Sequence, residues 1–276
     1  MEQITQGPAV ALPTTPEEWR NLTEAVCQVA RSTGAYLREA RRDFRPERVE
    51  QKHARDFVSY VDREAERRVV TGLRDLLPGA GFLTEEQTVA YGAERVCWVV
   101  DPLDGTTNFI HDVAPYAVSI ALRVERQVVL GVVCEACRDE CFYAWQGGGA
   151  WLDGRRLAVA ADGPEERALI GVELPYQAAD YAPVARRLID RFYGRAAGLR
   201  MNGSAAVSLC YVAAGRFAAW AEKYIRPWDF SAGWLLVTEA GGAVAGFGGG
   251  SCDPDGDNIV AAATPDLLRE LLAAIG

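Results

Sequence analysis

Apolar residues recur at helical spacing in two segments near the start of the chain. The first spacing predicts a helix that begins at Thr15-Pro16, an N-cap followed by proline at the first helical position, and ends near Arg41. Its apolar face consists of Leu22, Val26, Val29, Ala30 and Leu37. A second helix is predicted after Asp62, ending at Pro78-Gly79. Its apolar residues are Val69, Val70, Leu73, Leu76 and Leu77.

From Val96 the pattern changes to short, β-branched apolar runs, which predict antiparallel strands and hairpins. The runs are residues 97–100, 116–124, 128–136, 141–145 and, after a glycine-rich turn at 147–156, residues 157–160. Beyond about Gly163, strands and helices alternate again. Strands are predicted at 168–174, at 217–221 and near 243 and 259. Helices are predicted at 180–193 and from Asn202-Gly203-Ser204, Asp229 and Pro265.

These patterns predict two units that pack tightly, with no repeat or linker between them. Residues 1–162 form an α+β unit with an antiparallel sheet, and residues 163–276 form an α/β unit with a mixed sheet. A chain of 276 residues that is 49% hydrophobic can build a sizeable core, either as one large domain or as two smaller ones.

Composition narrows the classes of partner. Lys and Arg total 29 against 38 Asp and Glu, a net charge of −9, which disfavours a nucleic-acid partner. The first residues lack the basic and apolar regions of a signal peptide, and no apolar run approaches the roughly 18 residues of a membrane span. We therefore expect a cytoplasmic protein with no membrane partner.

The cysteines and histidines constrain any metal site. The seven cysteines are odd in number and have mostly apolar neighbours, which favours reduced thiols in a core. A zinc site at Cys134, Cys137 and Cys141 is an alternative, but the surrounding pattern is strand, turn, strand. Because the chain has only His53 and His111, a multi-histidine site is excluded, and a catalytic metal must be held by oxygen.

Candidate chemistry concentrates in residues 98–109, WVVDPLDGTTNF. Two carboxylates, Asp101 and Asp104, flank a stiff proline at the end of an apolar strand, and hard cations such as Mg²⁺ prefer oxygen ligands. Gly105 and Thr106 then offer backbone N–H groups to a phosphate. An ordinary turn is the structural alternative, because Asp, Pro and Gly are common in turns.

This segment resembles the signature of the inositol monophosphatase family, the lithium-sensitive phosphatases, position by position. Three further segments resemble motifs of the family and occur in the same order: residues 56–62, 82–87 and 226–242. The resemblance implies a layered α-β-α-β-α sandwich and a Mg²⁺-dependent phosphatase.

The resemblance also implies the metal ligands, for two or three Mg²⁺ ions. Glu85, Asp101 and the carbonyl of Leu103 would bind one ion, and Asp101, Asp104 and Asp229 a second. Glu85 would share a third, weaker ion. For the neighbouring Glu86 we expect only a solvated side chain.

For catalysis, the resemblance implies that Thr106 and Asp62 orient or deprotonate the attacking water, assisted by Glu85. We then expect in-line attack by hydroxide on phosphorus, without a phosphoenzyme. The structural alternatives are a turn hydroxyl for Thr106 and an N-cap for Asp62, at the start of the second helix.

Substrate contacts are implied for eight residues: Asp104, Gly105, Thr106, Gly203, Ser204, Ala205, Glu222 and Asp229. Helix N-capping is the alternative for Asn202 or Ser204 and for Asp229, and an exposed surface charge is the alternative for Glu222. Thr84 departs from the family pattern, because many family members have glycine at this position. Arg226 could reach a second anionic group or pair at the surface.

The resemblance makes myo-inositol 1-phosphate the leading substrate and a homodimer the expected assembly. Alternatives within the family's chemistry are histidinol phosphate, fructose 1,6-bisphosphate and 3′-phosphoadenosine 5′-phosphate. An alternative of another class is a catalytically silent relative that binds metal or a regulatory partner.

Overall fold

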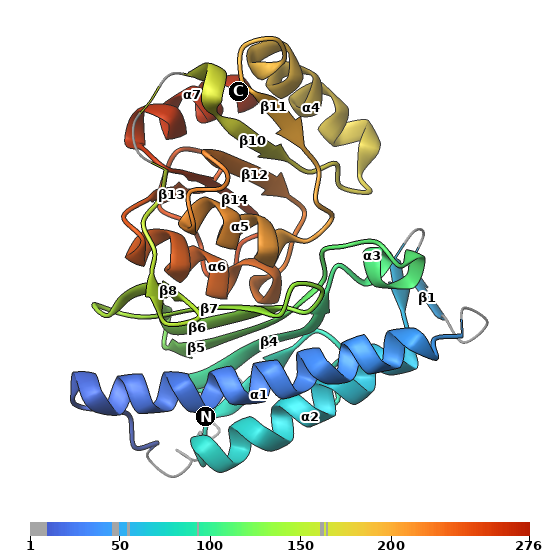
Figure 1. Cartoon of the computed structure of the whole chain (residues 1–276), viewed down its shortest axis with the longest axis vertical. Helices are drawn as coiled ribbons and strands as arrows, with labels where there is room; N and C mark the ends of the chain where they lie inside the picture. The colour runs from blue at the N-terminus through green and yellow to red at the C-terminus, as the bar shows by residue number, and fades with distance from the viewer. Residues whose placement is uncertain (1–9, 46–49, 54–55, 93, 161–162, 164) are drawn as a thin grey trace, which may run out of the picture.

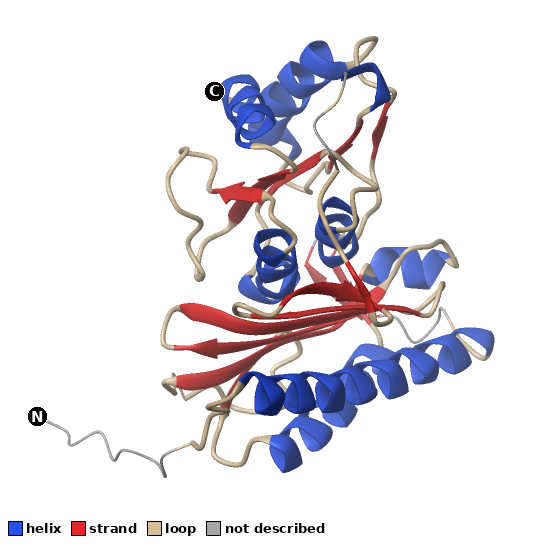
Figure 2. Ribbon diagram, turned by 60° about the vertical axis from the view of Figure 1, so that its left-hand side comes forward, coloured by secondary structure: helices blue, strands red, loops and turns tan. Residues whose placement is uncertain are grey.

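Five layers of secondary structure alternate through the molecule, as Figures 1 and 2 show. The structure, a computed structural model, describes residues 10–276 apart from 46–49, 54–55, 93, 161–162 and 164. The layers are a helix pair, a seven-stranded sheet, a second helix pair, a five-stranded sheet and a third helix pair. The predicted α-β-α-β-α architecture is confirmed. The proposed boundary at residue 162 lies outside the described residues and stays a prediction.

The first layer consists of α1 (Pro16–Arg42) and α2 (Tyr60–Leu76), which cover the outer face of the larger sheet. α1 begins with the expected Thr15 cap, and Glu18 completes a capping box. α2 begins earlier than predicted. Its N-cap is Ser59, and Asp62 is the third helical residue, whose carboxylate accepts from the Ser59 N–H at 2.8 Å. The structural alternative for Asp62, an N-cap role, is therefore wrong.

The seven-stranded sheet has the order β3-β4-β5-β6-β7-β8-β9. β3 (Gly81–Thr84) is parallel to β4 (Val96–Asp104), and every later pair is antiparallel. The remaining strands are β5 (Ala117–Val124), β6 (Gln127–Glu135), β7 (Glu140–Trp145), β8 (Gly149–Leu152) and β9 (Arg155–Arg156). A separate hairpin joins β1 (Glu50–His53) to β2 (Asp56–Val58).

One strand prediction in this region is wrong. Residues 157–160 form no strand. β8 and β9 lie instead within residues 147–156, where the glycines predict a turn. The turns on either side of β8 are shorter than this predicted turn. Ala150 and Leu152 alternate into the core from β8, so burial of these two side chains outweighs the turn preference of their neighbours.

The five-stranded sheet has the order β11-β10-β12-β14-β13 and is mixed, as predicted. Its strands are β10 (Leu169–Val172), β11 (Gly198–Arg200), β12 (Ala219–Lys223), β13 (Ala243–Ala245) and β14 (Asn258–Ala262). α4 (Ala178–Phe192) and α7 (Pro265–Ile275) cover its outer face, and η2 (Glu165–Arg167) precedes β10.

Between the sheets lie α5 (Ala205–Ala213) and α6 (Pro227–Glu239). Both helices are buried on nearly every face, because each packs against a sheet on either side. A short helix, α3 (Thr106–His111), follows β4 at the edge of this layer. Among the described residues, no helix combines the length and apolar character needed to cross a bilayer.

Candidate metal centre and active site

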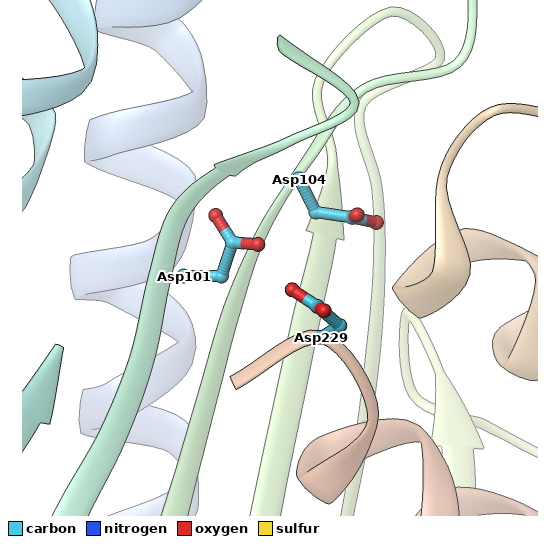
Figure 3. A group of neighbouring side chains, drawn as sticks. All are labelled: Asp101, Asp104 and Asp229. Carbon is cyan, nitrogen blue, oxygen red and sulfur yellow. The ribbon is translucent and has the colours of Figure 1, made fainter. Parts of the chain in front are cut away.

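Three aspartates meet where β4 ends and α6 begins. One carboxylate oxygen from each of Asp101, Asp104 and Asp229 lies within 4.8 Å of the others, and Figure 3 shows the three side chains gathered beside the end of β4. Asp101 and Asp104 are buried and Asp229 is half-buried. The structure therefore brings Asp229 together with two carboxylates that lie more than a hundred residues before it in the sequence.

A bulge in β4 puts its two carboxylates on one side of the strand. Side chains three residues apart point to opposite faces of a regular strand. Asp101 pairs with Ser119 and Asp104 with Ala117, so three steps on β4 match two on β5, and one residue is extra. This irregularity lets both aspartates face the same centre.

The parallel pairing of β3 with β4 places Glu85 beside the centre but outside the group of three aspartates. Thr84 lies opposite Val100, and the N–H of Glu85 donates to the carbonyl of Val100 at 3.2 Å. Glu85 is therefore aligned with Asp101. Burial has the largest effect on the pKa of Asp101 and raises it. The negative charges of Glu85, Asp104 and Asp229 raise this pKa further.

The electrostatics of the centre suit a divalent cation. Burial first, and neighbouring carboxylates second, raise the pKa values of Asp101 and Asp229 well above their usual range. Burial raises the pKa of Asp104 to about 6, although its Oδ2 accepts from Ser204 Oγ and, at 2.9 Å, from the N–H of Ala206. Crowded oxygen ligands of like charge fit an ion such as Mg²⁺, which would relieve their repulsion.

Beside this centre a hydroxyl and a carboxylate form a pair. Thr106 Oγ1 lies 3.1 Å from Asp62 Oδ1 and 3.0 Å from the carbonyl oxygen of Leu103. The hydroxyl has one hydrogen, so it donates to one of these acceptors at a time. Asp62 is buried, which raises its pKa, and Ser59 anchors its other oxygen.

The backbone after Asp104 approaches the start of α5 closely. Gly105 has φ +89°, and a Cβ there would lie 3.0 Å from the carbonyl oxygen of Pro115 and 3.2 Å from that of Gly203. Ser204 is the N-cap of α5, which confirms the N-cap alternative for this residue. Its hydroxyl also donates to Asp104. The predicted contact residues Gly203, Ser204 and Ala205 therefore lie next to the acidic centre.

Glu222 lies on β12 and is half-buried, so its alternative as an exposed surface charge is wrong. Burial, and then the charges of Glu173, Asp229 and Asp104, raise its pKa. The N-cap alternative for Asp229 is also wrong, because Asp229 is the third residue of α6 and accepts from the N–H of Arg226 at 2.6 Å. Arg226 is exposed, and Glu86 is half-buried.

Three supporting residues escaped the sequence analysis. Buried Glu66 accepts from the segment around Glu85, and buried Glu173 accepts from Asn202 and Gly203. Asn108 donates to the carbonyls of Pro115 and Asn202. The spacing of Glu66 one helical turn after Asp62 was an available signal, whereas Glu173 has only long-range partners and left none.

The cysteine alternative finds no support in the described part of the chain. Cys134 and Cys141 are buried opposite each other on β6 and β7, and Cys137 is exposed in the turn between them. The aspartate group is the sole set of three or more described His, Cys, Asp or Glu residues close enough to share an ion.

The fold and this centre define the class: a layered α/β protein with a carboxylate group between its layers that could hold a hard cation. The model of the inositol monophosphatase family matches residues 18–276. The chain belongs to this family, which confirms the resemblance. Its members are metal-dependent phosphatases that act on small phosphate monoesters.

Individual relatives are similar to this protein over most of the chain. Nus factor SuhB of Salmonella typhimurium is 40% identical over 255 residues, covering 91% of this chain and 94% of the relative. Inositol-1-monophosphatase of Mesorhizobium japonicum is 36% identical over 255 residues, covering 92% and 96%. The crystal structure of extragenic suppressor protein suhB from Bartonella henselae has a TM-score of 0.85 at 33% identity, covering 92% of this chain and 98% of that one.

Proposed function

We propose that this chain is a Mg²⁺-dependent phosphomonoesterase that hydrolyses myo-inositol 1-phosphate by attack of water on phosphorus. The observation that carries the proposal is the acidic centre of Asp101, Asp104 and Asp229 beside the pair of Thr106 and Asp62. Glu85, Asp101, the Leu103 carbonyl, Asp104 and Asp229 would hold two or three Mg²⁺ ions. When bound, Mg²⁺ supplies Lewis-acid activation of water and neutralises phosphate charge.

Thr106 and Asp62 would orient the attacking water. When Thr106 donates its hydrogen to Asp62, its oxygen lone pairs face away from Asp62 and can accept a hydrogen bond from water. The raised pKa of Asp62 makes its carboxylate a stronger proton acceptor than an exposed one. Glu85 would assist from the end of the neighbouring strand β3, and no nucleophilic side chain is needed.

The surroundings of Glu222 support a polyol monophosphate. A half-buried carboxylate accepts hydrogen bonds from hydroxyl groups and repels a second phosphate. Glu173, nearby and buried, adds to that negative field. Both favour inositol 1-phosphate over fructose 1,6-bisphosphate and 3′-phosphoadenosine 5′-phosphate. Gly203, Ser204 and Ala205 would contact the substrate from the start of α5, and Gly105 from the start of α3.

A second candidate is a regulatory role without catalysis, which the name Nus factor of the SuhB relatives favours. Retention of Asp62, Glu85, Thr106 and the three aspartates argues for catalysis. We also propose a cytoplasmic homodimer that lithium inhibits. Light scattering after size-exclusion chromatography tests the dimer, and an inhibition curve with LiCl tests lithium.

The decisive experiment measures phosphate release from inositol 1-phosphate, histidinol phosphate, fructose 1,6-bisphosphate and 3′-phosphoadenosine 5′-phosphate, with Mg²⁺ and with EDTA. We expect preference for the inositol ester, abolished by EDTA and by Asp104→Asn. Preference for another ester would replace the substrate and keep the metal centre. No release from any ester by folded protein would favour the regulatory role.

A further inference from the structure

A fully buried carboxylate on α2 binds the segment that carries Glu85. Glu66 is 0% exposed, and its three donors among the described residues are Thr84, the last residue of β3, and Glu86 and Thr88 just beyond that strand. Thr84 Oγ1 donates to Oε1 at 2.9 Å, the N–H of Glu86 donates to Oε2 at 2.7 Å, and the N–H of Thr88 donates to Oε1 at 2.7 Å. The donors therefore lie on both sides of Glu85.

These bonds constrain the position of Glu85. A buried carboxylate must find donors, and bonds to an ionised oxygen are about twice as strong as bonds between neutral groups. Glu66 binds the residue before Glu85 and the residue after it, while the N–H of Glu85 itself is bonded to Val100. The segment around Glu85 thus has partners on two elements: α2 binds its neighbours Thr84 and Glu86, and β4 binds its own N–H.

The same face of α2 also carries Asp62, which pairs with the Thr106 hydroxyl. Glu66 is four residues after Asp62, so both side chains leave α2 in the same direction, one turn apart. Asp62 contacts Thr106, and Glu66 contacts the Glu85 segment. One buried helix face therefore sets the relative position of two groups that come from separate segments of the chain.

We infer that Glu66 is a positioning residue: it holds Glu85 where its carboxylate can share Mg²⁺ with Asp101, and it touches neither metal nor substrate. This inference rests on the proposed function, because it takes Glu85 as a metal ligand. It also gives a physical role to Thr84, whose hydroxyl supplies one of the three donors where a glycine would supply none.

The test measures Mg²⁺ affinity directly, by isothermal titration calorimetry of metal into the metal-free protein. Glu66→Gln keeps the shape of the side chain but replaces one acceptor oxygen with an NH₂ donor. Loss of such supporting contacts typically weakens metal affinity about 10- to 100-fold, and we expect a loss of at least about 10-fold. The matched control is Glu64→Gln, a half-buried position on the same helix that pairs with Arg67 and Arg68. We expect wild-type affinity for this control.

A second pair of variants keeps the test valid if Glu66→Gln fails to fold. Thr84→Val removes one donor to Glu66, and Thr84→Ser retains it. We expect weaker Mg²⁺ binding for the valine variant and near wild-type binding for the serine variant. A purely structural role would lower the thermal midpoint of the metal-free protein and leave the Mg²⁺ affinity unchanged.

Glu85→Gln separates failure of this inference from failure of the proposed function. If Glu85→Gln weakens Mg²⁺ binding while folded Glu66→Gln and Thr84→Val bind as wild type does, the positioning role is overturned and the ligand assignment stands. If Glu85→Gln leaves Mg²⁺ binding unchanged, Glu85 is not a ligand, and both the assignment and the positioning role fall.

Discussion

The Thr106 hydroxyl has two acceptors, and the one that takes its hydrogen decides how a water beside it is oriented. We expect Thr106→Val and Asp62→Asn to lower kcat by about 10²- to 10⁴-fold, the usual contribution of a proton-transferring group. Mg²⁺ affinity should change little, because neither side chain is among the proposed ligands. Steady-state kinetics with calorimetric Mg²⁺ titration measures both quantities.

Thr107→Val is the matched control for that prediction. Thr107 is the next residue of α3, and its hydroxyl contacts Tyr176 at 3.2 Å. It should leave kcat within a few fold of wild type. Equal losses for the two threonine variants would show that α3 needs its hydroxyls for structure, and the orienting role of Thr106 would be wrong.

Asp104 predicts a pH dependence of stability for the metal-free protein. Its pKa of about 6 in the folded chain lies above its ordinary value of 3.8. Between these two values the folded state binds more protons than the unfolded state, so stability falls as pH rises through this window. Asp101 and Asp229 shift in the same direction. Urea denaturation in EDTA from pH 4 to pH 7 should show the fall.

The variant Asp104→Asn removes this carboxyl and lowers the repulsion on its neighbours. Its stability should therefore decrease less than that of the wild type across the same pH range. Parallel curves for the two proteins would mean that Asp104 has an ordinary pKa in the folded chain.

At the scale of elements, the sequence predicted what is encoded locally. Thr15 and Pro16 mark the start of α1, and the apolar spacing of the two N-terminal helices matches their buried faces. Asp101 and Asp104 were found because they share one short motif. Strands of two to four residues such as β8 and β11 were missed, because pairing with neighbours and burial define them rather than their own composition.

At the site, too, the residues in a local motif could be predicted, whereas those defined by long-range contacts could not. Glu85 and Asp229 were assigned by resemblance, since nothing in their spacing reveals that β3 and α6 meet the end of β4. Glu173 was not found at all, because its role exists only through contacts with residues about thirty positions later. Long-range hydrogen bonds of this kind leave no periodicity in a single sequence.

These contacts of Glu173 support a prediction about the start of α5. Glu173 accepts from the N–H groups of Asn202 and Gly203 at 2.9 and 3.2 Å, while Asn108 donates to the Asn202 carbonyl at 2.7 Å. The segment before Ser204 is thus held from β10 and from α3. Glu173→Gln disturbs one side of this arrangement, so we expect KM for the ester to rise about tenfold and stability to fall by roughly 1–3 kcal/mol.

Kinetics and urea denaturation measure these effects, with exposed Glu166→Gln as the charge-matched control. Mg²⁺ affinity should be retained, because Glu173 is not among the grouped aspartates. An unchanged KM in a destabilised variant would limit Glu173 to a structural role.

At the scale of the whole molecule, the three-aspartate group joins the seven-stranded sheet to the helix layer between the two sheets. Asp101 and Asp104 come from the seven-stranded sheet, and Asp229 comes from α6, which packs between the sheets. In the metal-free protein their mutual repulsion opposes this packing. A cation bound by all three carboxylates would replace that repulsion with attraction. We therefore expect Mg²⁺ to stabilise the fold, in addition to its role in the proposed hydrolysis.

The size of this stabilisation follows from mass action. At Mg²⁺ concentrations of about 100 times Kd, binding to the folded state alone adds roughly 2.7 kcal/mol, and each kcal/mol raises Tm by about 2–4 °C in a chain of this size. We expect scanning calorimetry to show Tm several degrees higher in Mg²⁺ than in EDTA. Asp229→Asn should lose most of that increase, whereas Asp266→Asn, an exposed carboxylate of α7, should keep it. Equal Tm values in Mg²⁺ and EDTA would contradict tight Mg²⁺ binding, because a ligand held by both halves must stabilise the state in which they are packed together.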